Sequence, residues 1–414
     1  MNTFANDSSV IATIEPENIK SVLSTDFKSY SLGDNRKRLM TPLLGEGIFT
    51  TDGAAWQHSR DMLRPNFVRT QIGDIDMFEP HIQNVIRAIP RDGEMIDLHD
   101  VFFSMSLDIA SEFLFGESTG MLSEEVDAET EAFVRAFSYC QSVMEGLEGV
   151  WGFLSLFVPD RRVKGEIKTV HGNLKFYFPL GIGFESAFRT HVQILTDFVD
   201  SLVEKALKNQ DKYESSKSQN PDHRYIFLHE LCSQTTSKPK IRSELLNILL
   251  AGRDTTASLL SNLWFQLSKS PTLWSKLQSE ISTLNGSFPS FEELKELKFL
   301  RAVLNESLRL HPVVPENGRQ AERDTTLPLG GGEDGKAPVV VRKGQLVAYS
   351  LWTMHRRKDL FGEDAEVFRP ERWLDGEEGK GLRVGWEYLP FNGGPRICIG
   401  RRSSLPYFSI LLWR

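Results

Sequence analysis

The residues best suited to chemistry lie near the carboxyl end, in the stretch FNGGPRICIG at positions 391–400. It holds Cys398, one of three cysteines in 414 residues, together with Arg396 and three glycines. A cysteine ligates a metal as its thiolate, and a helix N-terminus would stabilise that anion. Arg396 could bind an anionic group of the same ligand, and the glycines let the backbone approach a flat ligand. The stretch therefore favours a ligating cysteine.

Other interpretations of Cys398 stay open at this point. Zinc would require a second cysteine or histidine at ligand spacing, which the neighbouring sequence does not offer. A nucleophilic thiol would need a histidine partner that sequence spacing cannot reveal. A lone cysteine can also be a small buried hydrophobe.

A second candidate is AGRDTT, residues 251–256, in the middle of a long apolar segment. Ala251 and Gly252 would give a flat surface against which a bulky group could pack. Asp254 and Thr255 are poor helix formers, and burying them is costly unless they are used. The functional interpretation is a groove with a proton-delivery pair. The alternative, a satisfied polar kink, is equally compatible with the sequence.

Charged residues supply weaker signals. Glu306 and Arg309 stand three residues apart, and therefore on one helix face. Arg372 lies in the proline-punctuated FRPERW, and Trp56 and Arg60 are one helical turn apart in WQHSR. Taken singly, each of these could be an ordinary surface pair.

GGGEDGKA, residues 330–337, satisfies most of a phosphate-binding loop. However, Ala337 replaces the hydroxyl residue that would hold magnesium, and Glu333 and Asp334 would repel phosphate. An NTPase interpretation rests on this stretch alone. We therefore predict a glycine-rich turn between strands.

Helical periodicity dominates the elements that must position these residues. Helices are predicted within 133–150, 188–207, 241–269 and 292–310. Residues 337–352 alternate around a Lys-Gly turn and predict a hairpin, whereas polar residues 208–224 predict a solvated connector. The chain is thus expected to be mainly α with a small β-rich region.

The composition of the chain argues against several classes of protein. The net charge of −8 argues against nucleic-acid binding, and three cysteines are too few for a disulfide framework. The start lacks a basic region followed by an apolar run, so no signal peptide is predicted. The most apolar windows, 150–158 and 245–252, are shorter than the roughly 20 residues that span a bilayer. We therefore expect no anchor within this chain.

Together and in this order, the motifs resemble the cytochrome P-450 superfamily of haem-thiolate monooxygenases. AGRDTT is similar to its oxygen-activation motif, ESLR to its E-x-x-R, and WQHSR to its haem-propionate helix. The signature F-x-x-G-x-R-x-C-x-G is matched at Phe391, Gly394, Arg396, Cys398 and Gly400. The resemblance covers essentially all of 1–414 and implies one domain with the cytochrome P-450 fold.

The resemblance implies a role for each residue. Cys398 would be the axial thiolate of haem b, and Asp254 and Thr255 would relay protons to bound dioxygen. The remaining haem-contact residues would be Trp56, Arg60, Ala251, Gly252, Arg319, Phe391, Gly394, Arg396 and Gly400. A buried charge cluster of Glu306, Arg309 and Arg372 would support folding and haem incorporation. Ile48, Phe49, Val313 and Val314 would form an apolar substrate wall.

Stretches such as TIEPENIKSVLSTDFKSYSLG and MHRRKDLFGEDAEVFRPERW resemble the fungal class that hydroxylates n-alkanes and fatty acids. This implies a small aliphatic substrate, O2, and electrons from NADPH through NADPH-cytochrome P-450 reductase. The family location would be the cytosolic face of the endoplasmic reticulum membrane, with membrane association expected only for a full-length form. Two alternatives stay open: a terpenoid or aromatic substrate, and an inactive truncated product.

The ends depart from the family pattern. Family members begin with a membrane anchor, and after the cysteine they continue as a helix followed by β segments. Here RRSSLPYFSILLWR follows Gly400. Pro406 would fall inside that helix, at a cost of about 3 kcal/mol. We therefore expect a chain that is incomplete at both ends.

Overall fold

The computed structural model describes residues 10–67, 76–123, 125–155, 182–219, 225–286, 289–375 and 381–401. The helices in these ranges are α1 (Pro16–Lys20), α2 (Asp34–Leu44), α3 (Gly53–Leu63), α5 (Glu79–Ala88), α6 (Leu98–Phe115), α7 (Ala128–Ser155), α9 (Ile182–Lys208), α10 (Gln210–Gln219), α11 (Phe227–Gln234), α12 (Lys238–Ser268), α13 (Pro271–Ile281), α14 (Phe291–Glu296), α15 (Lys298–Leu310), α16 (Leu351–Met354) and α17 (Lys358–Phe361). The mainly helical fold predicted from the sequence is confirmed.

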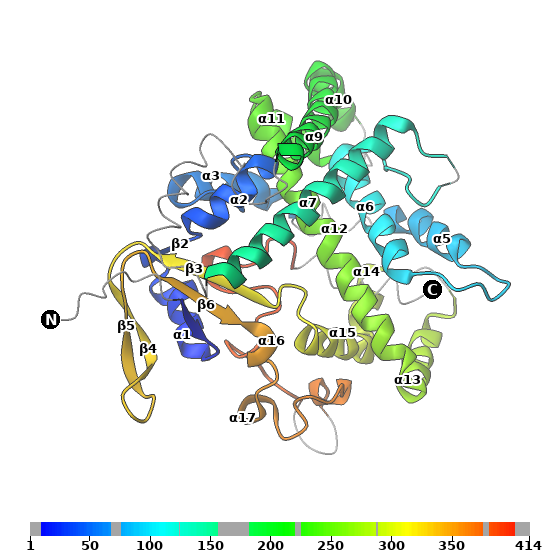
Figure 1. The fold of residues 1–414 in the computed structure, drawn as a ribbon. Helices are drawn as coiled ribbons and strands as arrows, with labels where there is room; N and C mark the ends of the chain where they lie inside the picture. Colours follow the sequence, from blue (N-terminus) through cyan, green and yellow to red (C-terminus); the bar gives the residue numbers. More distant parts are fainter. Residues whose placement is uncertain are drawn as a thin grey trace.

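The 31-residue helix α12 runs through the middle of the molecule (Figure 1). Its amino-terminal half packs into a hydrophobic cluster with α2, α3, α7, α9 and α11. Its carboxyl-terminal half packs into a second cluster with α5, α6, α13 and α15. The helix is buried on most sides, as its all-round apolar sequence predicts. Polar residues in its centre therefore lie inside the protein.

The strands form two small sheets. In the first, β1 (Ile11–Thr13), β6 (Leu346–Ser350), β3 (Glu316–Ala321) and β2 (Tyr30–Ser31) lie in that order. β1 and β6 are parallel, and the other pairs are antiparallel. The second sheet pairs β4 (Thr325–Gly331) with β5 (Ala337–Val341). The β region is therefore small and lies to one side of the helices (Figure 1).

The hairpin predicted over 337–352 is wrong, although both of its strands exist. β5 pairs with the preceding β4, and β6 pairs with β1 and β3 in the other sheet. Alternation predicts which face of a strand is buried but not which strand is its partner. The predicted turn at 330–337 is confirmed, because it joins β4 to β5.

Two predictions, one of a connector and one of a helix, need correction. The predicted connector at 208–224 contains α10, where Tyr213 is buried and stacks on His229. The predicted helix at 292–310 divides at Leu297 into α14 and α15. The Glu280 carboxylate accepts hydrogen bonds from the backbone N–H groups of Phe299 and Leu300, both at 2.8 Å. This cap stabilises the start of a separate helix, α15.

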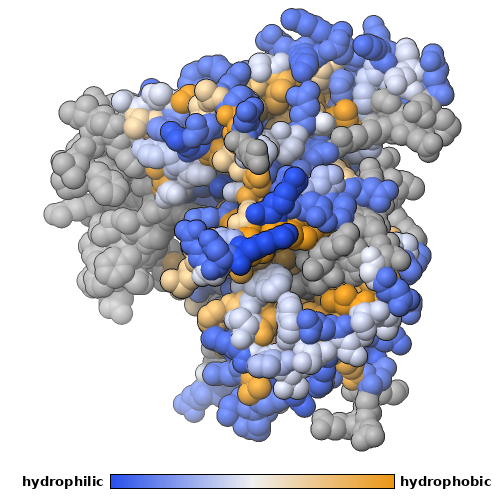
Figure 2. Space-filling model, turned by 90° about the vertical axis from the view of Figure 1, so that its right-hand side faces the viewer, coloured by the Kyte–Doolittle hydropathy of each residue, from blue (hydrophilic) through white to orange (hydrophobic). Residues whose placement is uncertain are grey.

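No helix in the described ranges combines the length and the apolar composition that crossing a membrane requires. On the face drawn in Figure 2, hydrophobic residues gather near the middle and hydrophilic residues surround them. The proline predicted to break a helix, Pro406, lies outside the described residues.

The buried His355 predicts a stability that depends on pH. Its Nε2 accepts a hydrogen bond from the Leu389 N–H (3.1 Å), and its Nδ1 lies 3.2 Å from the Arg309 carbonyl oxygen. Burial lowers the pKa of His355 from 6.5 to about 4. The unfolded chain therefore takes up a proton at a higher pH than the folded chain. As pH falls from 6.5 toward 4, the free energy of unfolding should drop by up to about 3 kcal/mol.

Urea unfolding at neutral pH and at a pH of about 4.5 would measure this loss. His355→Gln keeps an acceptor for the Leu389 N–H but does not titrate in this range. The wild-type chain should therefore lose more stability than the variant between the two pH values. Equal losses would show that His355 is not responsible.

Candidate functional site

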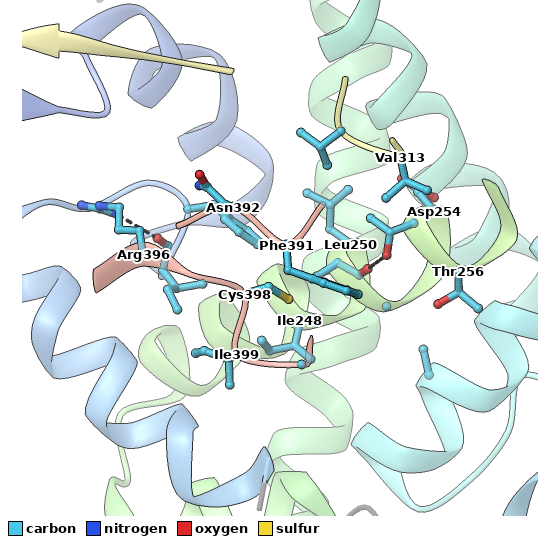
Figure 3. Close-up of a pocket in the computed structure, with 18 of the residues that line it drawn as sticks. Ile248, Leu250, Asp254, Thr256, Val313, Phe391, Asn392, Arg396, Cys398 and Ile399 are labelled. Atoms are coloured by element: carbon cyan, nitrogen blue, oxygen red, sulfur yellow. Dashed lines mark hydrogen bonds between the residues drawn. The ribbon is translucent and has the colours of Figure 1, made fainter. Parts of the chain in front are cut away.

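A cavity of about 630 Å³ lies between α12 and the loop that carries Cys398. This volume is within the range of small-molecule sites. Figure 3 shows Cys398 and Phe391 on the loop and Ile248 and Leu250 on α12. Most of the wall is apolar, and polar side chains are concentrated in a few places.

The Cys398 loop is held in a tight turn. The Cys398 N–H donates to the Phe391 carbonyl oxygen at 2.9 Å, which closes the loop on itself. Gly394 has φ +65°, and a Cβ there would overlap the carbonyl oxygen of Leu23. Glycine is therefore required for this turn. Gly394 is not part of the cavity wall, although Gly400 is.

The Cys398 sulfur faces the cavity (Figure 3). Cys398 has accessible surface, but neighbouring atoms crowd the sulfur closely enough that burial raises the pKa of the thiol. The backbone N–H of Gly400 and the positive charge of Arg60 act in the opposite direction. A coordinated cation would deprotonate such a thiol outright. The site therefore suits a metal ligand.

Basic groups gather at one end of the cavity. The wall includes Trp56, Arg60, Arg319 and Arg396, which the sequence singled out, and Arg36, which it did not. Arg319 is buried, and its Nε has no hydrogen-bond partner in the described part of the chain. Arginines concentrated in an apolar cavity are suited to binding carboxylates.

Arg396 also holds the neighbouring backbone. Its guanidinium donates to the carbonyl oxygen of Thr51 (3.0 Å) and to the carboxylate of Asp52 (2.5 Å). It lies over the Trp56 ring at 4.4 Å. Burial lowers the pKa of Arg396 to about 10, against the effect of Asp52, so it stays charged at neutral pH. The residue thus connects the cysteine loop to the start of α3.

The polar residues of α12 make specific contacts at the cavity wall. The Thr255 hydroxyl donates to the Ala251 carbonyl oxygen at 2.7 Å. The Gln141 side-chain amide of α7 donates to the Asp254 carboxylate, and Gln141 also lines the cavity. Sequence reasoning missed Gln141 because it lies far from Asp254 along the chain. Its only sequence signal is a polar residue in a largely apolar helix.

Other residues of the wall come from distant segments. Ile48, Phe49, Val313 and Val314 line the cavity, as do Ala251 and Gly252 of α12. A Cβ on Gly252 would point toward Ala110 of α6, at an ordinary distance of 3.5 Å. The predicted substrate residues therefore share the cavity with Cys398.

A buried charge cluster lies outside the cavity wall. Glu306 accepts hydrogen bonds from Arg309 (2.8 and 2.9 Å) and from Arg372 (2.9 Å). Glu306 and Arg309 are fully buried, and Arg372 is nearly so. Arg309 also donates to the carbonyl oxygens of His355 and Ala365. The cluster therefore joins α15 to the segment around 355–373.

Comparison with known proteins agrees with this arrangement. Residues 1–405 match the family described as Cytochrome P450. The chain belongs to the cytochrome P450 family. The chain is 44% identical, over 405 residues, to "Cytochrome P450 monooxygenase fsdH" of Fusarium heterosporum. Over 413 residues it is 43% identical to "Cytochrome P450 52A5" of Candida maltosa.

These alignments include 95% and 96% of this chain but only 65% and 72% of the two relatives. A third relative, "Cytochrome P450 monooxygenase himC" of Aspergillus japonicus, is 43% identical over 400 residues, which are 95% of this chain and 66% of that protein. The chain thus spans about two thirds of the length of the curated relatives that it matches.

The residues present fit the haem that a cytochrome P450 binds. Cys398 offers a thiol on one wall, and Arg319 offers a buried N–H group without a partner in the described ranges. Arg60 and Arg396 add positive charge for the two propionates, and Trp56 adds a flat ring. Apolar side chains around them would cover the faces of the macrocycle. Cys398 would therefore hold the iron and the arginines the carboxylates.

Proposed function

We propose that this P450 hydroxylates a small aliphatic substrate, an n-alkane or a fatty acid, with O2 and electrons from a reductase. The observation that carries the proposal is a single cavity with a thiol on one wall and apolar side chains around it. Haem held by the Cys398 thiolate would supply oxygen activation. The protein's own contribution is to hold that group, orient the substrate and control access of water and protons.

The apolar wall supports an aliphatic chain. Ile48, Phe49 and Val313 offer no hydrogen-bonding side-chain groups, so they would select by shape and apolar contact. The resemblance to the fungal hydroxylases of n-alkanes and fatty acids points in the same direction. A terpenoid or aromatic substrate is the alternative, since an apolar wall would also accept a compact ring.

The proposed reaction also requires partners. We infer that electrons come from NADPH through NADPH-cytochrome P-450 reductase, as the family resemblance implies. We place the protein at the cytosolic face of the endoplasmic reticulum membrane on the same basis.

Spectral titration of the haem-loaded protein tests the substrate class. We would add saturated fatty acids and n-alkanes of several lengths, with a cyclic terpene and an aromatic acid in parallel. The aliphatic compounds should produce a saturable shift of the haem spectrum at lower concentrations than the ring compounds. A response confined to ring compounds would favour the alternative substrate class.

Asp254 provides a test of proton delivery. Asp254→Asn keeps the shape and hydrogen-bonding capacity of the side chain but removes the ionisable group. If Asp254 moves a proton during turnover, product formation should fall by about 10²-fold while the substrate-binding shift is retained. Steady-state product assays and spectral titration would measure the two effects. Asp211→Asn, on the exposed helix α10, is the matched control and should have full activity. Full activity of Asp254→Asn would rule out this role.

A further inference from the structure

The loop between α2 and α3, residues 45–52, carries Ile48 and Phe49 into the cavity wall. Internal hydrogen bonds shape it: Thr50 Oγ1 donates to the Gly45 carbonyl oxygen at 2.6 Å and accepts from the Gly47 N–H at 2.9 Å. These contacts shape the loop but do not fix its position relative to α12. Contacts outside the loop must do that.

Asn247 of α12 makes such contacts, and it is fully buried. Its Oδ1 accepts from the Phe49 N–H at 3.0 Å, and its Nδ2 donates to the Leu44 carbonyl oxygen at 3.0 Å. Nδ2 also donates to the Ser243 carbonyl oxygen one helical turn earlier, at 2.7 Å. The amide therefore uses its acceptor and both donors. Its two outward contacts, to Leu44 and Phe49, lie on either side of residues 45–48 of the loop.

Two glycines make the close approach possible. A Cβ at Gly47 would overlap the side-chain amide of Asn247, and one at Gly45 would overlap the hydroxyl of Ser243. Neither side chain can easily withdraw, because Ser243 donates to the Pro239 carbonyl oxygen and Asn247 is fully bonded. The backbone of the loop at Gly45 and Gly47 therefore packs directly against side chains of α12, and a larger residue at either position would not fit.

The cysteine loop makes a second set of contacts to this loop. Arg396 donates to the carbonyl oxygens of Ile48 (3.4 Å) and Thr51 (3.0 Å). The Ile48–Phe49 segment is thus bonded both to α12 and to the segment that carries Cys398. Arg396 is assigned to cofactor binding, whereas Asn247 is not in the cavity wall. A substitution of Asn247 therefore removes no side chain from the wall.

We propose that Asn247 is a positioning residue that sets where Ile48 and Phe49 stand in the cavity, and thereby which carbon of the substrate is hydroxylated. The specificity part rests on the proposed aliphatic hydroxylase function. The reason is geometric: the Phe49 side chain projects from the backbone whose N–H group Asn247 holds. An asparagine in the middle of a buried helix is otherwise unfavourable.

The test combines two readouts on the whole chain. Asn247→Leu keeps the branched shape of the side chain but removes both outward hydrogen bonds, and Gly47→Ala pushes the loop away without removing any polar group. The matched control is Asn18→Leu, because Asn18 is also buried and its amide also bonds one backbone carbonyl oxygen and one backbone N–H group, both of Leu329. Leu329 is not part of the cavity wall.

The first readout is amide hydrogen exchange of the peptide containing Phe49, in protein prepared without haem. Loss of the Asn247 contacts should speed exchange there by roughly 5- to 30-fold, the range that one or two kcal/mol produces. Asn18→Leu should leave this peptide unchanged. Unchanged exchange in both Asn247→Leu and Gly47→Ala would overturn the positioning role, and failure of Asn247→Leu to fold would leave Gly47→Ala to decide it.

The second readout is the distribution of hydroxylated positions on one saturated fatty acid. Asn247→Leu and Gly47→Ala should shift this distribution in the same direction, and Asn18→Leu should not. An unchanged distribution, with the loop released, would overturn the specificity role. If the wild-type chain makes no hydroxylated fatty acid, the proposed function fails, and the exchange result still decides whether Asn247 positions the loop.

Discussion

Replacing Cys398 by serine is expected to remove the far-red-shifted Soret band that a thiolate-ligated haem gives after reduction and addition of carbon monoxide. A serine hydroxyl cannot replace the electron donation of a thiolate. The loop should still form, because its closing hydrogen bond comes from the backbone N–H of residue 398 and its turn from Gly394. The difference spectrum of the reduced protein measures the effect.

Cys140→Ala and Cys232→Ala are the matched controls. Both cysteines are free and buried, and neither belongs to the cavity wall. Burial raises the pKa of Cys140 to about 12 and that of Cys232 to about 11, so neither is a thiolate at neutral pH. Both variants should give the wild-type band. An unchanged spectrum of Cys398→Ser, or a band lost in either control, would contradict the assignment of Cys398.

Replacing Glu306 by alanine is expected to cause the largest loss of stability. The carboxylate also accepts from the Arg369 N–H and the Trp373 Nε1–H, each at 2.9 Å. Its removal would leave the buried guanidinium group of Arg309 without its counter-charge, and Arg372 would keep only Asp364, at 3.3 Å. Breaking a buried ion pair in this way costs about 3–5 kcal/mol. Urea unfolding should show this loss, and haem content after purification should fall with it.

Glu363→Ala is the control for removing a carboxylate. Glu363 pairs with Lys358 at 3.0 Å, and both side chains are exposed, so the variant should unfold close to wild type. Glu306→Gln retains the shape and acceptor oxygen and should lose less than Glu306→Ala. A Glu306→Ala protein as stable as Glu363→Ala would mean that the cluster does not hold α15 in place.

Local patterns predicted the elements well, because periodicity reports which face of a helix or strand is buried. The long helix around AGRDTT is an example, and the glycine content of 330–337 predicted the turn there. The pairing of β5 with β4 was not predictable, since the alternation of apolar and polar residues does not indicate which strand is the partner. The helix α10 was hidden by its polar composition, and the single buried Tyr213 is a weak signal.

The candidate site could also be predicted only in part. Motifs with fixed spacing identified Cys398, Arg60 and Arg396, and the family resemblance added Arg319, but neither identified Arg36, which shares the same cavity. Gln141 and Asn247 were missed because their partners, Asp254 and Phe49, are far away in the sequence. A polar amide in an apolar helix indicates that the side chain has a hydrogen-bond partner, but it does not identify that partner. Such residues become visible only when the helices are packed together.

The most direct test of the central claim is a turnover under ¹⁸O2. The chain, loaded with haem, would be incubated with NADPH-cytochrome P-450 reductase, NADPH and a saturated fatty acid, and the product analysed by mass spectrometry. The account predicts a hydroxy acid carrying one ¹⁸O atom in its new hydroxyl group. A protein that binds haem and takes up electrons but forms no hydroxy acid, or one whose new hydroxyl oxygen comes from water, would contradict it.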